Sequence, residues 1–202
     1  FTVVIDPGHG GADQGLVVGN LREKDVNLRI AEVIASKLRG KGVEVRLTRD
    51  KDIPLSLDRR IRFANSLHCD LYLSIHCDGS AIQRKRGYRI LVDRIWRGRE
   101  ERTIIAASPP LSAERLQAAY ELATKIASGF EGIGLAGRVY RLPIHRFSEL
   151  TMPALILEPG FLSNDADRIL LTDEDFLNTI GDVVADVISE MKGDVAGGRK
   201  GQ

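Results

Sequence analysis

Two histidines and two glutamates occupy positions where a metal-dependent hydrolase would need them. His9, His76 and Glu158 each follow, within a few residues, a short apolar run typical of a buried strand. Glu23 stands where the glycine-rich loop around His9 gives way to a helical pattern. Because the carboxyl ends of parallel strands share one edge of a sheet, these groups could meet there. Two imidazoles and one carboxylate can hold a zinc ion with one position open for water, and a second carboxylate can accept that water's proton.

A second interpretation of the same residues stays open. Their spacing is not a local HExxH-type motif, so they could equally be polar side chains that are satisfied at strand ends. The loop 5–15 contains Pro7 and four glycines, which allow it to fold tightly, and on its own it could be a polar turn with an incidental histidine. A phosphate-binding loop is disfavoured, because this segment has neither the GxxxxGK[ST] lysine and hydroxyl nor the GxGxxG spacing.

Apolar periodicity predicts an alternation of strands and helices around these groups. An amphipathic helix is predicted over 25–41, where Val26, Ile30 and Val33 recur at helical spacing. The other expected elements are strands over 2–5, 43–48, 71–75, 88–92, 139–142 and 154–157, and helices that begin after Ser56, Ser112, Asn164 and Thr172. Asn164 with Asp167, and Thr172 with Asp175, resemble capping boxes. The alternation predicts a three-layer α/β domain with a mostly parallel, mixed sheet flanked by helices on both faces.

Length and composition favour one folded domain. With 202 residues, 43% of them hydrophobic, the chain can bury one substantial core, which we expect over 1–192. The glycine-rich segment 193–202 is expected to be a disordered tail. A net charge of +1, from 29 basic and 28 acidic side chains, gives no argument for a nucleic-acid partner. No run approaches the ~18 apolar residues of a membrane span, and we expect no signal peptide within the given residues, since Phe1 opens directly on the first strand.

The two cysteines are expected to be free thiols outside any metal site. Cys69 and Cys77 flank the predicted strand 71–75, and an extended chain would hold them too far apart for a disulfide. Cys77 should point to the opposite side from His76 if the strand continues, so we expect it not to bind the metal.

Four further polar residues are candidates for a role near the predicted metal site. Asp6 and Asp13 could orient histidine ligands, or they could shape the glycine loop through Asx-type hydrogen bonds, and the second role is favoured. His68, near a helix end, and His145, in a loop, are expected to be ordinary surface or helix-end histidines.

Several motifs, met in order along the chain, resemble one family. These motifs are Ile5-Asp6-Pro7-Gly8-His9-Gly10-Gly11 with Asp13 and Gly15, Glu23-Lys24-Asp25 before Asn27-Leu28, Thr48-Arg49-Asp50, Arg59 with Ala64-Asn65, Ser74-Ile75-His76, and Leu157-Glu158-Pro159-Gly160-Phe161-Leu162-Ser163-Asn164. Together they are similar to the zinc-dependent N-acetylmuramoyl-L-alanine amidases of the type 3 family. The similarity runs from Val3 to Val187, which makes chance agreement an unconvincing explanation.

The resemblance implies an amidase catalytic domain in which His9, Glu23 and His76 hold Zn²⁺ and Glu158 is the catalytic carboxylate. It implies hydrolysis of the amide that joins the lactyl group of N-acetylmuramic acid to L-alanine in peptidoglycan. It therefore implies an autolysin-type enzyme outside the cytoplasmic membrane, in the periplasm or cell wall. We expect a monomer, and the sequence identifies no protein activator.

This sequence departs from the family pattern at a few positions. Cys77 and Asp78 follow His76 where relatives usually carry Ala and Asn, and Pro159 follows the expected catalytic glutamate. Two rival functions stay open beside the amidase. One is a non-catalytic domain of the same fold that binds cell-wall glycopeptide without cutting it, and the other is a zinc peptidase that acts on ordinary peptides. The retained Glu158 disfavours the first, because binding alone has no use for a general base.

The most basic part of the chain, 83–102, admits two interpretations. With Tyr88 and Trp96 it could form a cationic, aromatic rim that attracts anionic wall polymer, but a solvated loop is favoured. Some family members carry an inhibitory helix in this region. The segment 96–110 has no clear helical face here, so we expect no self-inhibition.

Overall fold

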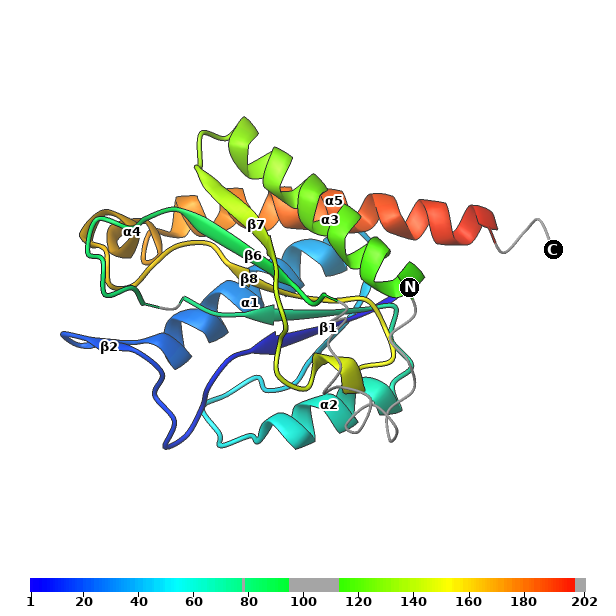
Figure 1. Cartoon of the computed structure of the whole chain (residues 1–202), viewed down its shortest axis with the longest axis horizontal. Helices are drawn as coiled ribbons and strands as arrows, with labels where there is room; N and C mark the ends of the chain where they lie inside the picture. Colours follow the sequence, from blue (N-terminus) through cyan, green and yellow to red (C-terminus); the bar gives the residue numbers. More distant parts are fainter. Residues whose placement is uncertain (78, 95–112, 199–202) are drawn as a thin grey trace, which may run out of the picture.

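Six strands form one mixed sheet in the computed structural model, which describes residues 1–77, 79–94 and 113–198 (Figure 1). They are β1 (Thr2–Pro7), β4 (Glu44–Leu47), β5 (Leu71–Ile75), β6 (Tyr88–Val92), β7 (Gly137–Arg141) and β8 (Ala154–Glu158). The strand order is β4-β1-β5-β8-β6-β7, and every pairing is parallel except that of β6 with β8. The mostly parallel, mixed sheet expected from the sequence is therefore confirmed. A small hairpin of β2 (Val17–Val18) and β3 (Leu21–Arg22) was not predicted.

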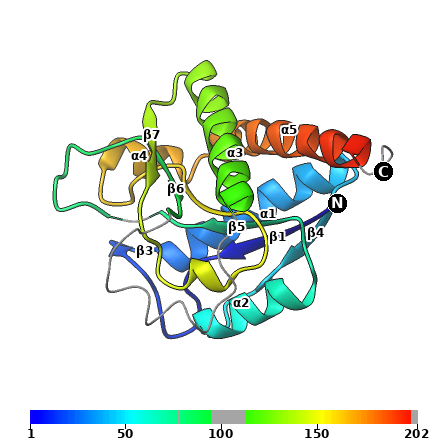
Figure 2. The same cartoon turned by 45° about the vertical axis from the view of Figure 1, so that its right-hand side comes forward.

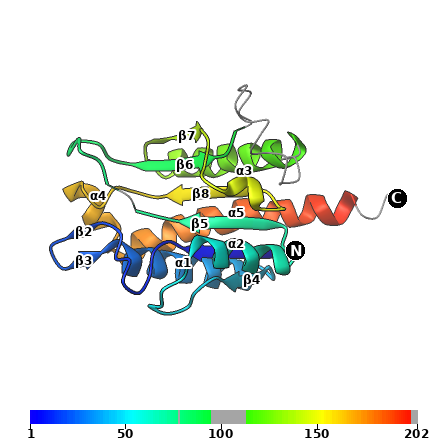
Figure 3. The same ribbon diagram turned by 60° about the horizontal axis from the view of Figure 1, so that its bottom comes forward.

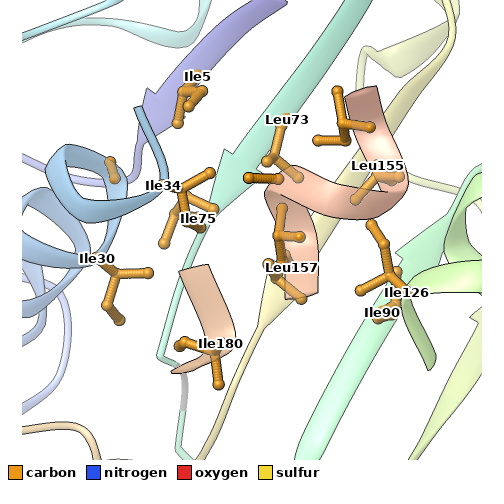
Figure 4. Close-up of a cluster of buried hydrophobic side chains, with 14 of the residues drawn as sticks. Ile5, Ile30, Ile34, Leu73, Ile75, Ile90, Ile126, Leu155, Leu157 and Ile180 are labelled. Carbon is orange, nitrogen blue, oxygen red and sulfur yellow. The ribbon is translucent and has the colours of Figure 1, made fainter. Parts of the chain in front are cut away.

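Helices cover both faces of this sheet, as predicted. On one face lie α1 (Glu23–Gly40), α3 (Ala113–Gly132) and α5 (Glu174–Gly198), and on the other lie α2 (Leu57–Ser66) and the short 3-10 helix η3 (Phe147–Glu149) (Figure 2). The larger core joins Ile5, Leu73 and Leu155 of the strands to the first group of helices (Figure 4). The smaller core joins Val4 and Tyr72, the alternate residues of the same strands, to the second group. The central strands β1 and β5 are thus buried on both faces, which accounts for their continuous apolar runs.

The register of the parallel strands aligns their carboxyl ends. Pro7 pairs with Ile75, and Ile75 pairs with Leu157. The next residue on each strand is therefore Gly8, His76 and Glu158, three neighbours along one edge. Figure 3 shows β2, β3 and the short helix α4 (Asp165–Leu170) gathered at the end of the sheet to which β8 points. All the segments expected to carry chemistry begin at this edge.

Two predicted helix caps are confirmed and one is wrong. Ser56 accepts the Arg59 N–H at the start of α2, and the Asn164 side chain accepts two backbone N–H groups at the start of α4. The helix α5 is capped by Asp173, whose Oδ1 accepts the Phe176 N–H at 2.8 Å, and not by Thr172. Thr172 instead donates its hydroxyl to carbonyls at the end of α4. Adjacent capping residues offer the same chemistry, and the close spacing of α4 and α5 decides between them.

The last helix continues into the segment expected to be a disordered tail. It extends through Gly198. Three expectations lie outside the described residues: the Ser112 cap, the absence of a helix over 96–110, and the effect of Asp78. Over the part of the chain that is described, no helix has the length and apolar character needed to cross a membrane.

Candidate metal centre

The three predicted metal ligands meet at the carboxyl edge of the sheet. His9 comes from the loop after β1, His76 follows β5, and Glu23 is the first residue of α1. Each offers one ligand atom, and these atoms all lie within 4.8 Å of one another. Glu23 Oε1 lies 3.2 Å from His9 Nε2 and 3.1 Å from His76 Nδ1. Among the His, Cys, Asp and Glu side chains of 1–77, 79–94 and 113–198, this is the one group of three so placed.

Glu23 is held in place by both of its oxygens. The residue is 2% exposed, its Oε2 accepts the Leu16 N–H at 2.9 Å, and its Oε1 accepts the Cys77 N–H at 3.2 Å. Burial alone would raise the pKa of this carboxyl, but its hydrogen bonds with His76 and His9 hold the pKa well below its ordinary value. An ionised, immobile carboxylate therefore lies between the two imidazoles.

His9 is positioned by the glycine loop. It adopts a left-handed backbone with φ of 62°, and its Nδ1 lies 2.9 Å from Asp13 Oδ2. The hydrogen bond with Glu23 raises the pKa of His9 to about 9, against the effect of burial and with help from Asp13. Asp13 also accepts the Gly15 N–H, so it both orients the histidine and shapes the loop, the two roles weighed for it. Asp6 contacts neither histidine.

Two glycines leave room for the candidate ligands. A Cβ on Gly8 would lie 2.3 Å from the His76 ring, and a Cβ on Gly15 would lie 2.6 Å from both Glu23 Oε2 and His9 Cδ2. Contacts this short do not occur in folded proteins, so any side chain at either position would displace a candidate ligand. The glycines therefore serve close packing as well as backbone freedom.

Two buried arginines support the glycine loop by donating hydrogen bonds to its carbonyls. Arg49 donates to the carbonyls of Pro7, Gly8 and Lys24 at 2.7–2.9 Å. Arg60 donates to the Pro7 and His9 carbonyls. Carbonyls that would otherwise be buried without partners are satisfied in this way, and the loop is fixed on both sides of His9.

Arg60 also forms a buried ion pair with Asp6, at 2.5 Å between Nη1 and Oδ1. Burial alone would raise the pKa of Asp6, but Arg60 and a hydrogen bond from Thr48 hold the pKa below its ordinary value. Asp6 thus supports the loop through Arg60 and not by contacting a histidine.

Glu158 lies beside the three candidate ligands at the end of β8. The His76 N–H donates to the Leu157 carbonyl at 3.1 Å, which places Glu158 level with His76. Glu158 is 4% exposed, and its Oε2 forms an ion pair with Arg89 Nε, the residue opposite it in the antiparallel β6–β8 pairing. The Arg89 guanidinium lies over the Phe161 ring, 4.8 Å from its centre. A buried carboxylate is thus fixed at the same edge as the histidines.

The donor set fits a metal ion of the zinc type. Two imidazole nitrogens and one carboxylate oxygen are the ligands of many catalytic zinc sites, which keep a fourth position open. The Asp13 carboxylate lies 2.9 Å from His9 Nδ1, the kind of outer partner that often orients a metal-binding histidine.

The side chains of the other candidates are not part of this group. Cys77 is buried in the core on the α1 side of the sheet, and both cysteines are free, as predicted. His68 and His145 contribute nothing to the three-residue group.

Sequence reasoning missed the supporting residues. Arg49 was noted only as part of a motif and Arg60 not at all, and the partner of Glu158, Arg89, was counted only as part of a basic segment. The one available signal is that Arg60 shares the predicted helix face of Leu57, Ile61 and Ala64.

Comparisons with known proteins give a consistent result. The family model described as N-acetylmuramoyl-L-alanine amidase matches residues 3–190. The N-acetylmuramoyl-L-alanine amidase LytC of Bacillus subtilis (strain 168) is 31% identical over 166 residues, which cover 82% of this chain and 30% of LytC. The germination-specific N-acetylmuramoyl-L-alanine amidase of the same organism is 30% identical over 183 residues, 84% of this chain and 70% of that protein.

A solved structure shares the fold closely. The catalytic domain of CwlV, an N-acetylmuramoyl-L-alanine amidase from Bacillus (Paenibacillus) polymyxa var. colistinus, matches with a TM-score of 0.76 at 32% identity. The match covers 95% of this chain and 98% of that domain. The chain therefore corresponds in extent to a catalytic domain, while it spans less than a third of the length of LytC.

Proposed function

Because the chain belongs to the N-acetylmuramoyl-L-alanine amidase family, we propose that it hydrolyses the amide between the lactyl group of N-acetylmuramic acid and L-alanine in peptidoglycan. The observation that carries this proposal is the approach of His9, Glu23 and His76 within 4.8 Å of one another, at an edge that also holds Glu158. The substrate lies outside the cytoplasmic membrane, so we also propose an extracytoplasmic place of action, in the periplasm or cell wall, for a monomeric catalytic domain.

His9, Glu23 and His76 are proposed to hold a zinc ion. When bound by such residues, zinc acts as a Lewis acid and lowers the pKa of water toward neutrality. Asp13 would fix the His9 tautomer that carries its proton on Nδ1, which leaves Nε2 facing the metal position. Glu23 needs no rearrangement, because its hydrogen bonds from Leu16 and Cys77 already orient both oxygens.

Glu158 is proposed to move the proton. Its carboxylate would accept a proton from the attacking water and later donate it to the amine of L-alanine as the C–N bond breaks. The ion pair between Arg89 Nε and Glu158 Oε2 restricts the carboxylate to one orientation, which general acid–base catalysis requires.

The test is digestion of purified cell walls with the metal-loaded protein, with and without a chelator. We expect release of intact stem peptide with a new L-alanine amino terminus, abolished by the chelator and restored by added zinc. Wall binding without any release would support a non-catalytic glycopeptide-binding module instead. New amino termini within the peptide would support a zinc peptidase.

A further inference from the structure

The basic loop 79–87 lies at the same edge of the sheet as the candidate metal centre. It follows β5, whose carboxyl end carries His76, and it leads into β6, which runs antiparallel to β8 and so begins at this edge. Three hydrogen bonds tie it down: Ser80 N–H to Ser163 Oγ at 2.9 Å, Asn164 Nδ2 to the Gln83 carbonyl at 2.8 Å, and Gly87 N–H to Asp167 Oδ2 at 2.8 Å. The loop is therefore part of the fixed structure around the site.

A cavity of about 410 Å³ lies between this loop and the start of α4. Its lining consists of Gln83, Arg84 and Arg86 from the loop and the segment 163–166, and we call it the arginine pocket. The Ser163 and Asn164 side chains are engaged in hydrogen bonds within the protein, so the two guanidinium groups are the main binding groups of this pocket. The volume suits one or two amino-acid side chains rather than a polymer laid across a flat surface.

The arginine pocket carries a net positive charge that no carboxylate among the described residues neutralises through Arg84 or Arg86. Arg84 and Arg86 are exposed and form no ion pair with any described carboxylate, whereas Arg89 pairs with Glu158 and Arg168 pairs with Asp165. Asp165, the acidic residue of the lining, is thus already engaged by Arg168. Two unpaired guanidinium groups at a concave site are suited to a carboxylate, which arginine binds through paired N–H donors.

Cationic side chains connect the arginine pocket to Glu158. The Lys85 ammonium lies 5.3 Å from the centre of the Phe161 ring, and the Arg89 guanidinium lies 4.8 Å from the same centre. Arg89 in turn contacts Glu158. A ligand that extends from the reacting bond into the pocket would therefore pass Arg89, which is paired with Glu158, and the Lys85 ammonium.

We propose that the arginine pocket binds a carboxylate of the stem peptide, on the leaving-amine side of the scissile bond. This inference rests on the proposed function. The lactyl carboxyl of the sugar is consumed in the scissile amide, so the negative charges of the substrate close to that bond lie on the acidic residues that follow L-alanine. A positive, concave site beside the carboxylate that would protonate the leaving amine matches that side of the substrate.

The first test measures binding without requiring turnover. Wild-type protein, the double variant Arg84→Gln/Arg86→Gln and the control Arg62→Gln are titrated with stem peptide that carries free carboxylates and with the same peptide amidated. Arg62 is exposed on α2 and pairs with Asp58. We expect the free-carboxylate peptide to bind the wild type and the control about tenfold more tightly than the amidated one, and the double variant to lose this preference.

The second test uses soluble muropeptides with the same two peptides attached. The double variant should raise KM for the acidic substrate by about tenfold with little change in kcat, and should leave KM for the amidated substrate unchanged. Equal binding of both peptides by the wild type would overturn the inference, and continued hydrolysis would then leave the proposed function intact. Peptide preference without any hydrolysis would reject the amidase activity and keep the pocket.

A third outcome would reassign the pocket. If the double variant binds and hydrolyses both peptides like the wild type but is released from intact walls at lower salt, Arg84 and Arg86 bind an anionic wall polymer and the carboxylate assignment is overturned.

Discussion

The two halves of the site edge are built by opposite means. At the ends of β1 and β5, the polar side chains Glu23, Arg49 and Arg60 are buried, and each is paired with carbonyls, backbone N–H groups or carboxylates. In the loop between β5 and β6, opposite the segment 163–166 that follows β8, Arg84 and Arg86 are exposed and have no carboxylate partner within the described residues. The half whose buried polar groups are paired can keep three metal-binding side chains in fixed positions. The half whose guanidinium groups lack a carboxylate partner among the described residues can bind an anion. The same side chain, arginine, serves both purposes because its partners differ.

Removal of a candidate ligand should give the largest effect. His76→Ala takes one imidazole from the three-residue group, so we expect near-complete loss of bound metal after dialysis and a fall in wall hydrolysis of about a thousandfold or more. Metal analysis of the dialysed variant, beside Arg84→Gln as a control in the other half of the edge, checks this. A fully metallated His76→Ala protein would remove His76 from the ligand set.

Loss of Arg60 should show that the region around His9 and His76 depends on the pairing of its buried polar groups. Arg60→Leu leaves Asp6 buried without its ion-pair partner, removes the Arg60 donor of the His9 carbonyl and leaves the Pro7 carbonyl with Arg49 alone, so the unfolding free energy should fall by about 3–5 kcal/mol. Arg84→Gln, at an exposed arginine without an ion pair, should change it by less than about 0.5 kcal/mol. Urea unfolding of both variants makes the measurement. Similar losses for the two would contradict the contrast between the halves.

Much of the fold followed from the sequence because its signals are local. The runs at 71–75 and 88–92 coincide with β5, which is buried on both faces, and with β6, whose buried residues alternate with partly exposed ones. The meeting of His9, Glu23 and His76 was predicted from one assumption, that parallel strands share a carboxyl edge. The family resemblance then selected those residues among the polar groups at strand ends.

The remainder depends on contacts that no local pattern contains. Arg49 and Arg60 bind carbonyls at positions 7–9, about 40 to 50 residues away in sequence, and a carbonyl partner leaves no trace in residue type. The pairing of Arg89 with Glu158 requires the antiparallel register of β6 on β8, which apolar periodicity does not specify. For the same reason, the arginine pocket was visible in the sequence only as a basic segment.

A single added methyl group near His76 should have a smaller effect, which we expect on metal affinity. Gly8→Ala would bring a Cβ to 2.3 Å from the His76 ring, so the ring must move, and we expect metal affinity to fall by about ten- to a hundredfold. Gly40→Ala is the matched control, because a Cβ there meets nothing within 4 Å, and its stability should change by no more than about 1 kcal/mol. Competition with a chromophoric chelator measures the affinity of each. Wild-type affinity in Gly8→Ala would show that the packing against His76 is not required.

The central claim is that one edge of the sheet holds the metal with three residues and moves the proton with a fourth. Glu158→Gln tests it most directly, because it keeps the size of the side chain and removes its basicity. We predict one bound metal ion per chain, as in the wild type, and a fall in kcat on cell walls of about a hundredfold to ten-thousandfold. Full activity in Glu158→Gln, or loss of its metal, would contradict the division of roles between Glu158 and the group His9, Glu23 and His76.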